Sequence, residues 1–96
     1  MAVFFIATSR IKDPAKFADY GSKAAGTFLP FGGELVARGK AYESLAGESD
    51  HHAVGVVRFA NMEALNSWFR SADYQALISL RDAAADMTLV AYAEPA

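Results

Sequence analysis

The chain contains no cysteine among its 96 residues, and this absence excludes disulfides, thiolate metal sites and cysteine nucleophiles. It also has no cluster of lysines and arginines, and its formal net charge is -2. Neither nucleic acid nor an anionic membrane is therefore an expected partner. The apolar run over residues 2–7 is too short for a signal peptide or a membrane span. We expect a cytoplasmic protein.

The residues that are present describe a globular protein. The chain is 53% hydrophobic and 21% charged, with only 7 glycines and 3 prolines, which is a composition far from that of disordered chains. A length of 96 residues supports a single hydrophobic core, because two domains would leave neither half with enough chain. We expect one domain over residues 1–96.

The order of apolar patterns and breakers predicts six elements. Asp13 followed by Pro14 indicates a helix start, and Asn61 indicates another. Ser71 resembles a further cap and predicts a kink in the second helical region. The expected strands and helices are a strand over 3–8, a helix from 14 to 28, a strand over 35–38 closed by Gly39, a long loop over 40–50, a strand over 53–59, helical pieces from 62 to 81 and a strand over 87–92.

This βαββαβ order predicts an α+β, ferredoxin-like fold with a four-stranded antiparallel sheet and both helical regions on one face. The other face of such a sheet is normally polar, yet these strands are apolar on both sides. Exposed apolar side chains on one whole face cost several kcal/mol at roughly 25 cal/mol per Å². We therefore expect a homodimer in which two sheets face each other, a dimeric α+β barrel. A monomer with an apolar ligand groove is the alternative.

Several segments are similar to a family of proteins. The run Phe31-Gly32-Gly33-Glu34-Leu35-Val36-Ala37-Arg38-Gly39, the run from Trp68 to Leu77 and the ending Leu80-Arg81-Asp82-Ala83-Ala84-Ala85-Asp86 resemble motifs of domain of unknown function 1330 (DUF1330). The chain departs from that pattern at Ala72, where the family usually has proline, and in the loop over 48–52, which lacks tryptophan and proline.

The resemblance implies a dimeric α+β barrel domain that needs no cofactor. Members of the wider superfamily act on small organic molecules, as cofactor-free monooxygenases and muconolactone isomerases do. One hypothesis is therefore a cofactor-independent isomerase- or monooxygenase-like enzyme, with a small organic acid or aromatic compound as the expected ligand. The alternative is a non-catalytic dimeric module that binds a small molecule or another protein.

Three types of side chain are candidates for a ligand pocket. His52 could act in acid–base chemistry, but His51 and His52 are adjacent and should point to opposite sides of a strand, so we expect no shared metal site. Glu43, in the long loop, is a candidate base. Trp68 and Tyr74 flank the predicted kink, where they form either a wall for a flat ligand or ordinary core packing.

The arginines have two interpretations. Arg38 and Arg58 lie on neighbouring predicted strands, and Arg81 lies on the last helical piece. A guanidinium beside an apolar sheet can hold a ligand carboxylate through two parallel hydrogen bonds. The alternative is an internal ion pair with Glu34, Glu43 or Asp86. For Arg81 we expect a pair with Asp86 that ties the helix to the last strand.

Overall fold

The structure, a computed structural model, describes residues 1–95. Four strands and four α-helices follow one another along the chain. They are β1 (Val3–Ile11), α1 (Pro14–Phe28), β2 (Glu34–Lys40), β3 (Ala53–Phe59), α2 (Met62–Arg70), α3 (Ala72–Gln75), α4 (Ile78–Ala84) and β4 (Ala85–Ala93), and a short 3₁₀ turn, Leu29–Phe31, follows α1.

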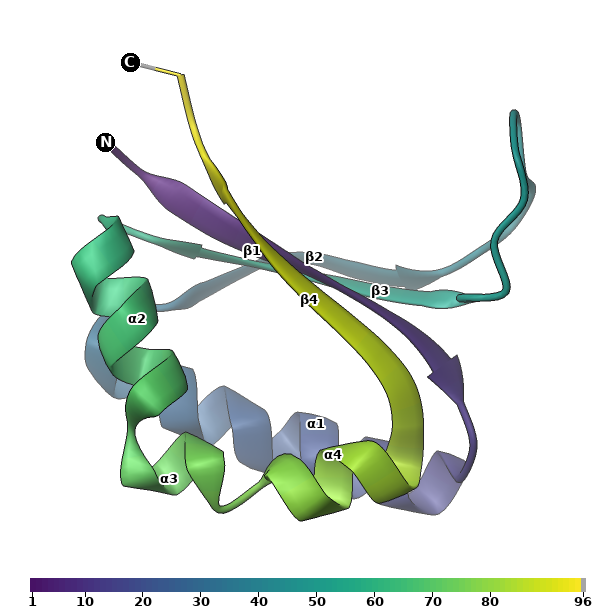
Figure 1. Cartoon of the computed structure of the whole chain (residues 1–96), viewed down its shortest axis with the longest axis horizontal. Coiled ribbons are helices and arrows are strands. Elements are labelled where there is room, and N and C mark those ends of the chain that lie inside the picture. Colours follow the sequence, from purple (N-terminus) through teal and green to yellow (C-terminus); the bar gives the residue numbers. More distant parts are fainter. Residues whose placement is uncertain (96) are drawn as a thin grey trace.

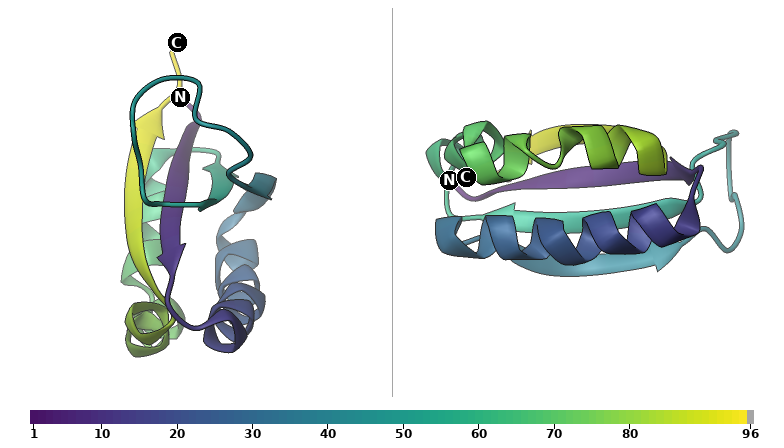
Figure 2. Two further views of the ribbon diagram at one scale, coloured as in Figure 1. Left: turned by 90° about the vertical axis from the view of Figure 1, so that its right-hand side faces the viewer. Right: turned by 90° about the horizontal axis from the view of Figure 1, so that it is seen from below.

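The strands form one antiparallel sheet in the order β2-β3-β1-β4. All helices lie on one side of this sheet, and α1 and α4 run side by side beneath it (Figures 1 and 2). The other side of the sheet carries no helix (Figure 1). The predicted α+β, ferredoxin-like fold is confirmed, and the first and third strands are the central ones. Within the described residues, no helix is both long and apolar enough to cross a lipid bilayer.

The ends of α1 follow from local chemistry. The Asp13 carboxylate accepts a hydrogen bond from the backbone N–H of Lys16 at 3.1 Å, which caps the helix start. At the other end, Gly32 has a φ of 77°, a left-handed conformation that glycine adopts without steric cost. A Cβ on Gly33 would lie 2.9 Å from atoms of Phe28, so the chain can turn closely against the helix end only with glycine there.

The second helical region breaks where serine predicted a break. Asn61 caps α2 by accepting a hydrogen bond from the N–H of Ala64 at 2.8 Å. The Ser71 hydroxyl donates to the carbonyl of Trp68 at 2.7 Å and accepts from the N–H of Tyr74 at 3.2 Å, so one side chain ends α2 and starts α3. The expected single piece after Ser71 is wrong, because a second break separates α3 from α4.

Three strands are longer than the sequence predicted. β1 extends to Ile11. β2 does not end at Gly39, as expected, but continues to Lys40. β4 begins at Ala85, two residues earlier than expected, and Ala85 is also the C-terminal cap residue of α4. Helix and strand are joined directly because Ala85 adopts an extended backbone immediately after the last helical residue.

The hydrophobic core lies between the sheet and the helices, at the end of the sheet near α2. The Trp68 ring is at its centre, with a relative exposure of 2%, and stacks on Phe5 with 5.0 Å between ring centroids. The rings of Phe59 and Phe28 also contact it. The remaining buried apolar members are Val3, Tyr20, Ala24, Val57, Leu65 and Tyr74.

Candidate ligand cavity

A cavity of about 570 Å³ lies between α1 and the sheet, beside this core. Small side chains create it. Its floor consists of Ala7 and Ser9 of β1 and Ala53 and Gly55 of β3, which pair directly across the two strands. Above this floor, α1 presents Ala18, Gly21 and Ala25. Because short side chains face one another across this gap, the space between helix and sheet stays open.

The closed end of the cavity is aromatic. Phe5, Phe28 and Trp68 line it. The indole N–H of Trp68 donates to the Thr27 hydroxyl at 3.0 Å and is therefore already paired. This end consequently offers aromatic ring surface, a surface suited to a flat apolar group.

The β2 edge of the cavity is cationic. Leu35 pairs with Val57, whereas Ala37 pairs with Val56, so Val36 is the additional residue of a β-bulge. The bulge reverses the alternation along β2 and places Arg38 opposite Gly55, on the cavity side. Lys40, two residues further, also lines the cavity. All residues of β2 are exposed, so this edge forms the mouth.

Neither cation at the mouth is neutralised within residues 1–95. Arg38 and Lys40 form no ion pair with a described carboxylate. The alternative in which Arg38 pairs with Glu34, Glu43 or Asp86 is therefore wrong. The described lining also contains no aspartate, glutamate or histidine. The site thus combines an apolar interior with two positive charges at its entrance.

A second polar group joins α1 to α3 and α4. The hydroxyls of Tyr20 and Tyr74 are 2.9 Å apart, and the Arg81 guanidinium donates to the Tyr74 hydroxyl at 3.2 Å. Burial, and then the neighbouring Tyr74, raise the pKa of Tyr20, so its phenol ionises even less readily than that of an ordinary tyrosine. Burial alone lowers the pKa of Arg81, but the hydrogen bond to Tyr74 and the contact with Asp82 outweigh this effect and raise it.

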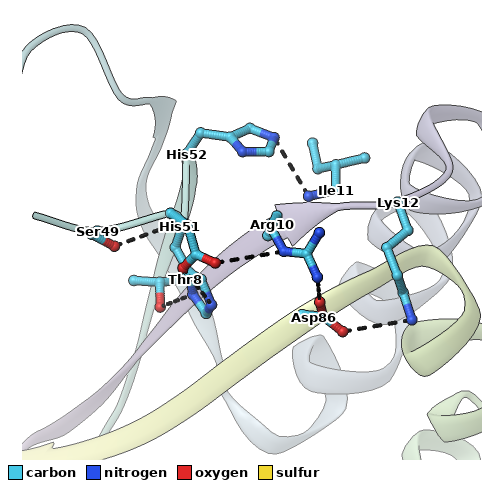
Figure 3. A network of polar contacts seen from close by, with 9 residues as sticks. Thr8, Arg10, Ile11, Lys12, Ser49, His51, His52 and Asp86 are labelled. Atoms are coloured by element: carbon cyan, nitrogen blue, oxygen red, sulfur yellow. Dashed lines mark hydrogen bonds and ion pairs between the residues drawn. The ribbon is translucent and has the colours of Figure 1, made fainter.

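The expected pair between Arg81 and Asp86 is wrong. Arg81 instead contacts its neighbour Asp82 at 3.2 Å. Asp86 accepts a hydrogen bond from Arg10 and forms an ion pair with Lys12, at the end of β1 (Figure 3). The direct junction between α4 and β4 explains the difference, because the extended backbone from Ala85 onward places Asp86 opposite Arg10 in the sheet.

The two histidines bind separate groups, as their adjacency predicted. His51 Nδ1 lies 2.8 Å from the Thr8 hydroxyl, whereas His52 Nε2 lies 3.4 Å from the N–H of Ile11 (Figure 3). The carbonyl and N–H of His52 also bond to Ala41 and Ser9, so this residue closes the long loop onto β1. Among residues 1–95, no group of three or more His, Asp or Glu side chains is placed to hold a metal ion.

The structure brings two of the six candidate residues to the cavity. Arg38 and Trp68 line it. Tyr74 is completely buried and, with Arg81, belongs to the tyrosine network. Glu43 lies in the exposed loop, and His52 lies at its end. Ser9, Tyr20 and Lys40 also line the cavity and were not predicted from the sequence. The small residues Ala7, Ser9, Ala53 and Gly55, spaced two apart on their strands, were a sequence signal for open space on that face.

The helix-free face of the sheet has a different character. Its centre is apolar, and towards one end the rings of Phe4 and Tyr92 stack with centroids 5.5 Å apart. Arg58 and Glu94 form an ion pair of 2.8 Å at one end, and Arg10 and Asp86 pair at the other. Val36, Val54, Val90 and Tyr92 have relative exposures of 56%, 39%, 41% and 45%. We call this surface the open face.

The fold and the cavity define a ferredoxin-like α+β domain with an apolar site beneath its sheet that opens at the β2 edge. The chain belongs to the family described as domain of unknown function (DUF1330), whose model matches residues 2–94. No curated protein matches the sequence.

Solved structures of low sequence identity share this fold. A protein of unknown function from Rhodopseudomonas palustris, RPA0582, is 22% identical with a TM-score of 0.81, over 98% of this chain and 84% of that one. A dimeric ferredoxin-like protein of unknown function from Jannaschia sp. CCS1 is 10% identical with a TM-score of 0.81, over 98% and 100%. SnoaB, a cofactor-independent oxygenase from Streptomyces nogalater, is 14% identical with a TM-score of 0.73, over 99% and 94%.

Proposed function

We propose that the protein binds a small organic acid with a flat apolar body in the cavity between α1 and the sheet. The observation that carries this proposal is the pairing of an aromatic interior with Arg38 and Lys40 at the mouth, both without a described carboxylate partner. A volume of about 570 Å³ lies within the range of small-molecule sites.

The two parts of such a ligand are recognised by different forces. Its apolar body leaves water to lie against the rings of Phe5, Phe28 and Trp68, which contributes roughly 25 cal/mol per Å² of the ligand's own apolar surface. Its carboxylate accepts hydrogen bonds from Arg38, and a charge-assisted bond contributes about 1.5–3 kcal/mol. An uncharged ligand gains only the first contribution, so the site should distinguish an acid from its ester.

Calorimetric titration with benzoate, phenylacetate and their methyl esters tests the proposal. We expect the acids to bind more tightly than the esters, and Arg38→Ala to weaken acid binding by at least tenfold. Arg70→Ala is the matched control, because Arg70 is exposed at the end of α2 and does not line the cavity. Equal affinity for acid and ester, or an equal effect of both substitutions, would contradict the proposal.

We also propose that the protein is a homodimer paired through the open face. This face carries large apolar side chains that the chain's own helices leave uncovered. The long loop before β3 rises on the same side of the sheet (Figure 1) and carries Tyr42 and Leu45, which are 97% and 91% exposed. The similar fold of a dimeric protein from Jannaschia supports the same assembly.

A charge placed on the open face tests the dimer. Val90→Glu should halve the mass measured by sedimentation velocity, because pairing would bury an unpaired carboxylate. Leu29→Glu is the control, since Leu29 is 63% exposed near the end of α1, away from the open face. An unchanged mass for Val90→Glu would exclude the open face as the interface.

Cofactor-independent catalysis in the same cavity is the second candidate function. The similar fold of SnoaB, a cofactor-independent oxygenase, is the observation that favours it. The described lining holds no carboxylate or imidazole base, and the raised pKa of Tyr20 keeps its phenol neutral. A substrate would therefore have to be acidic enough to ionise beside Arg38. Oxygen consumption by metal-free protein with acidic phenols tests this function, and binding without turnover leaves the binding role.

The proposed location of the protein is the cytoplasm, on the basis of its sequence composition. Fractionation of cells that express the full chain checks this proposal. Recovery with membranes or in a secreted fraction would contradict it.

A further inference from the structure

Besides the two cations at its mouth, the cavity has a buried polar side chain, Ser9, for which the described protein supplies no partner. Ser9 lies on the central strand β1 and lines the cavity floor. Its relative exposure is 2%, and its hydroxyl forms no hydrogen bond with the described residues. Within residues 1–95, every side-chain oxygen without a hydrogen bond keeps some accessible surface. The Ser9 hydroxyl is therefore accessible, and the space next to Ser9 is the cavity.

An unpaired hydroxyl is unfavourable in these surroundings. Its neighbours along the strand, Ala7 and Ile11, are apolar, and so is Met87, which pairs with it on β4. A buried hydroxyl without a partner costs free energy that an alanine would not. The unpaired Ser9 hydroxyl is therefore best explained by a ligand that enters the cavity and brings an oxygen or nitrogen to pair with it.

The sheet register places this hydroxyl relative to the cations. Ser9 pairs with Ala53, and Ala53 pairs with Lys40, so the three residues form one row across β1, β3 and β2. Neighbouring strands lie about 4.8 Å apart, which separates the backbones of Ser9 and Lys40 by about 10 Å. The residue between them is an alanine, so the ligand body has room to lie along this row.

We propose that the ligand is an aromatic acid with a hydrogen-bonding oxygen at the end opposite its carboxylate, and that Ser9 selects for this oxygen. This inference rests on the proposed binding of an organic acid and adds the position of a second polar group. The carboxylate faces Arg38 and Lys40, while a hydroxyl or carbonyl oxygen on the far side of the ring bonds to Ser9. An oxygen next to the carboxylate lies at the mouth and cannot reach Ser9.

Three benzoates of similar size test the inference by calorimetric titration. We expect the wild-type protein to bind 4-hydroxybenzoate at least tenfold more tightly than 4-methylbenzoate or 2-hydroxybenzoate. Ser9→Ala should reduce the preference for 4-hydroxybenzoate over 4-methylbenzoate to less than threefold, while binding of 4-methylbenzoate is retained. This substitution removes only an unpaired hydroxyl, so the protein should fold normally, and its melting temperature checks that.

The outcomes separate the two proposals. If the wild-type protein shows no preference for 4-hydroxybenzoate, or if Ser9→Ala keeps that preference, the role of Ser9 is overturned. Acid binding then still stands. A failure of the wild-type protein to bind any of the three benzoates contradicts the proposed function, and the selection by Ser9 with it. A water molecule as the natural partner of Ser9 predicts equal affinities for the three compounds and thus also overturns the inference.

Discussion

The two faces of the sheet differ in the size of their apolar side chains and in whether helices cover them. On β1, Phe5 and Ala7 face the helices, whereas Phe4 and Ile6 face the open side. The covered face has large residues at one end, where they pack into the core, and small ones at the other, where they leave a cavity. The open face has large residues and no covering helix. Apolar character alone therefore does not define a surface's role, because side-chain volume separates core, cavity and interface.

The largest effect should come from emptying the core of the covered face. Trp68→Ala removes a 2% exposed ring that contacts four other aromatic rings in the core, and should lower the free energy of unfolding by about 3–5 kcal/mol. Tyr92→Ala, on the open face, is the comparison variant. Its loss of unfolding free energy relative to the wild type should grow with protein concentration, because Tyr92 stabilises the dimer. Chemical denaturation at two protein concentrations measures both. Equal losses, independent of concentration, would remove the distinction between the faces.

A smaller effect is expected in the tyrosine network under the covered face. Tyr74→Phe leaves the Arg81 guanidinium and the Tyr20 hydroxyl without their shared partner and should cost about 1–3 kcal/mol. Tyr92→Phe provides the control, because Tyr92 is 45% exposed and water can replace any bond it makes. Denaturant unfolding of both variants checks this prediction. A loss below about 0.5 kcal/mol for Tyr74→Phe would show that the network contributes little stability.

Alkaline pH should lower the free energy of unfolding through Tyr20, which lies on the covered side of the sheet. Burial raises the pKa of Tyr20 above its ordinary value of 10.0. Above that pH the unfolded chain loses a proton that the folded chain keeps, so the free energy of unfolding falls, by about 1.4 kcal/mol per pH unit from this one group. Below pH 10 this contribution is fully present. Unfolding measured between pH 8 and 11 should give a shallower decline for Tyr20→Phe than for the wild type, and identical slopes would refute the assignment.

The smallest effect on stability should come from filling the cavity. A Cβ at Gly55 meets no atom within 4 Å, so Gly55→Val fits into space that is already open. We expect a gain of about 0.5–1 kcal/mol in stability, because valine favours strands and restricts the unfolded chain. Benzoate affinity should fall at least tenfold in the same variant, since the new side chain occupies the floor of the cavity. Titration and melting of Gly55→Val measure the two effects, and unchanged affinity would place the ligand elsewhere.

Much of the fold could be predicted because its signals are local. Asp13, Asn61 and Ser71 each predicted a cap, and each makes the expected hydrogen bond. The apolar pattern on both sides of the strands predicted a sheet with one uncovered apolar face. These signals depend on short-range chemistry and on alternation along a strand, both of which are visible in a single sequence.

The site could be predicted only in part, because it depends on register. The bulge at Val36 decides that Arg38 faces the cavity, and no residue type in β2 announces it. The direct junction at Ala85 decides that Asp86 meets Arg10 and not Arg81. Trp68 was recognised as a candidate, but only the packing shows that its ring closes one end of a cavity while its N–H is already paired.

Methyl NMR of the wild-type protein during titration with 4-hydroxybenzoate tests most directly whether the covered face is the ligand site. Methyl groups report the face on which a side chain lies, whereas backbone amides are shared by both faces. We expect the methyl signals of Ala7 and Ala53, which line the cavity, to shift, while those of Ile6 and Val90 on the open face stay in place. Shifts confined to Ile6 and Val90, or no shift at all, would contradict this assignment.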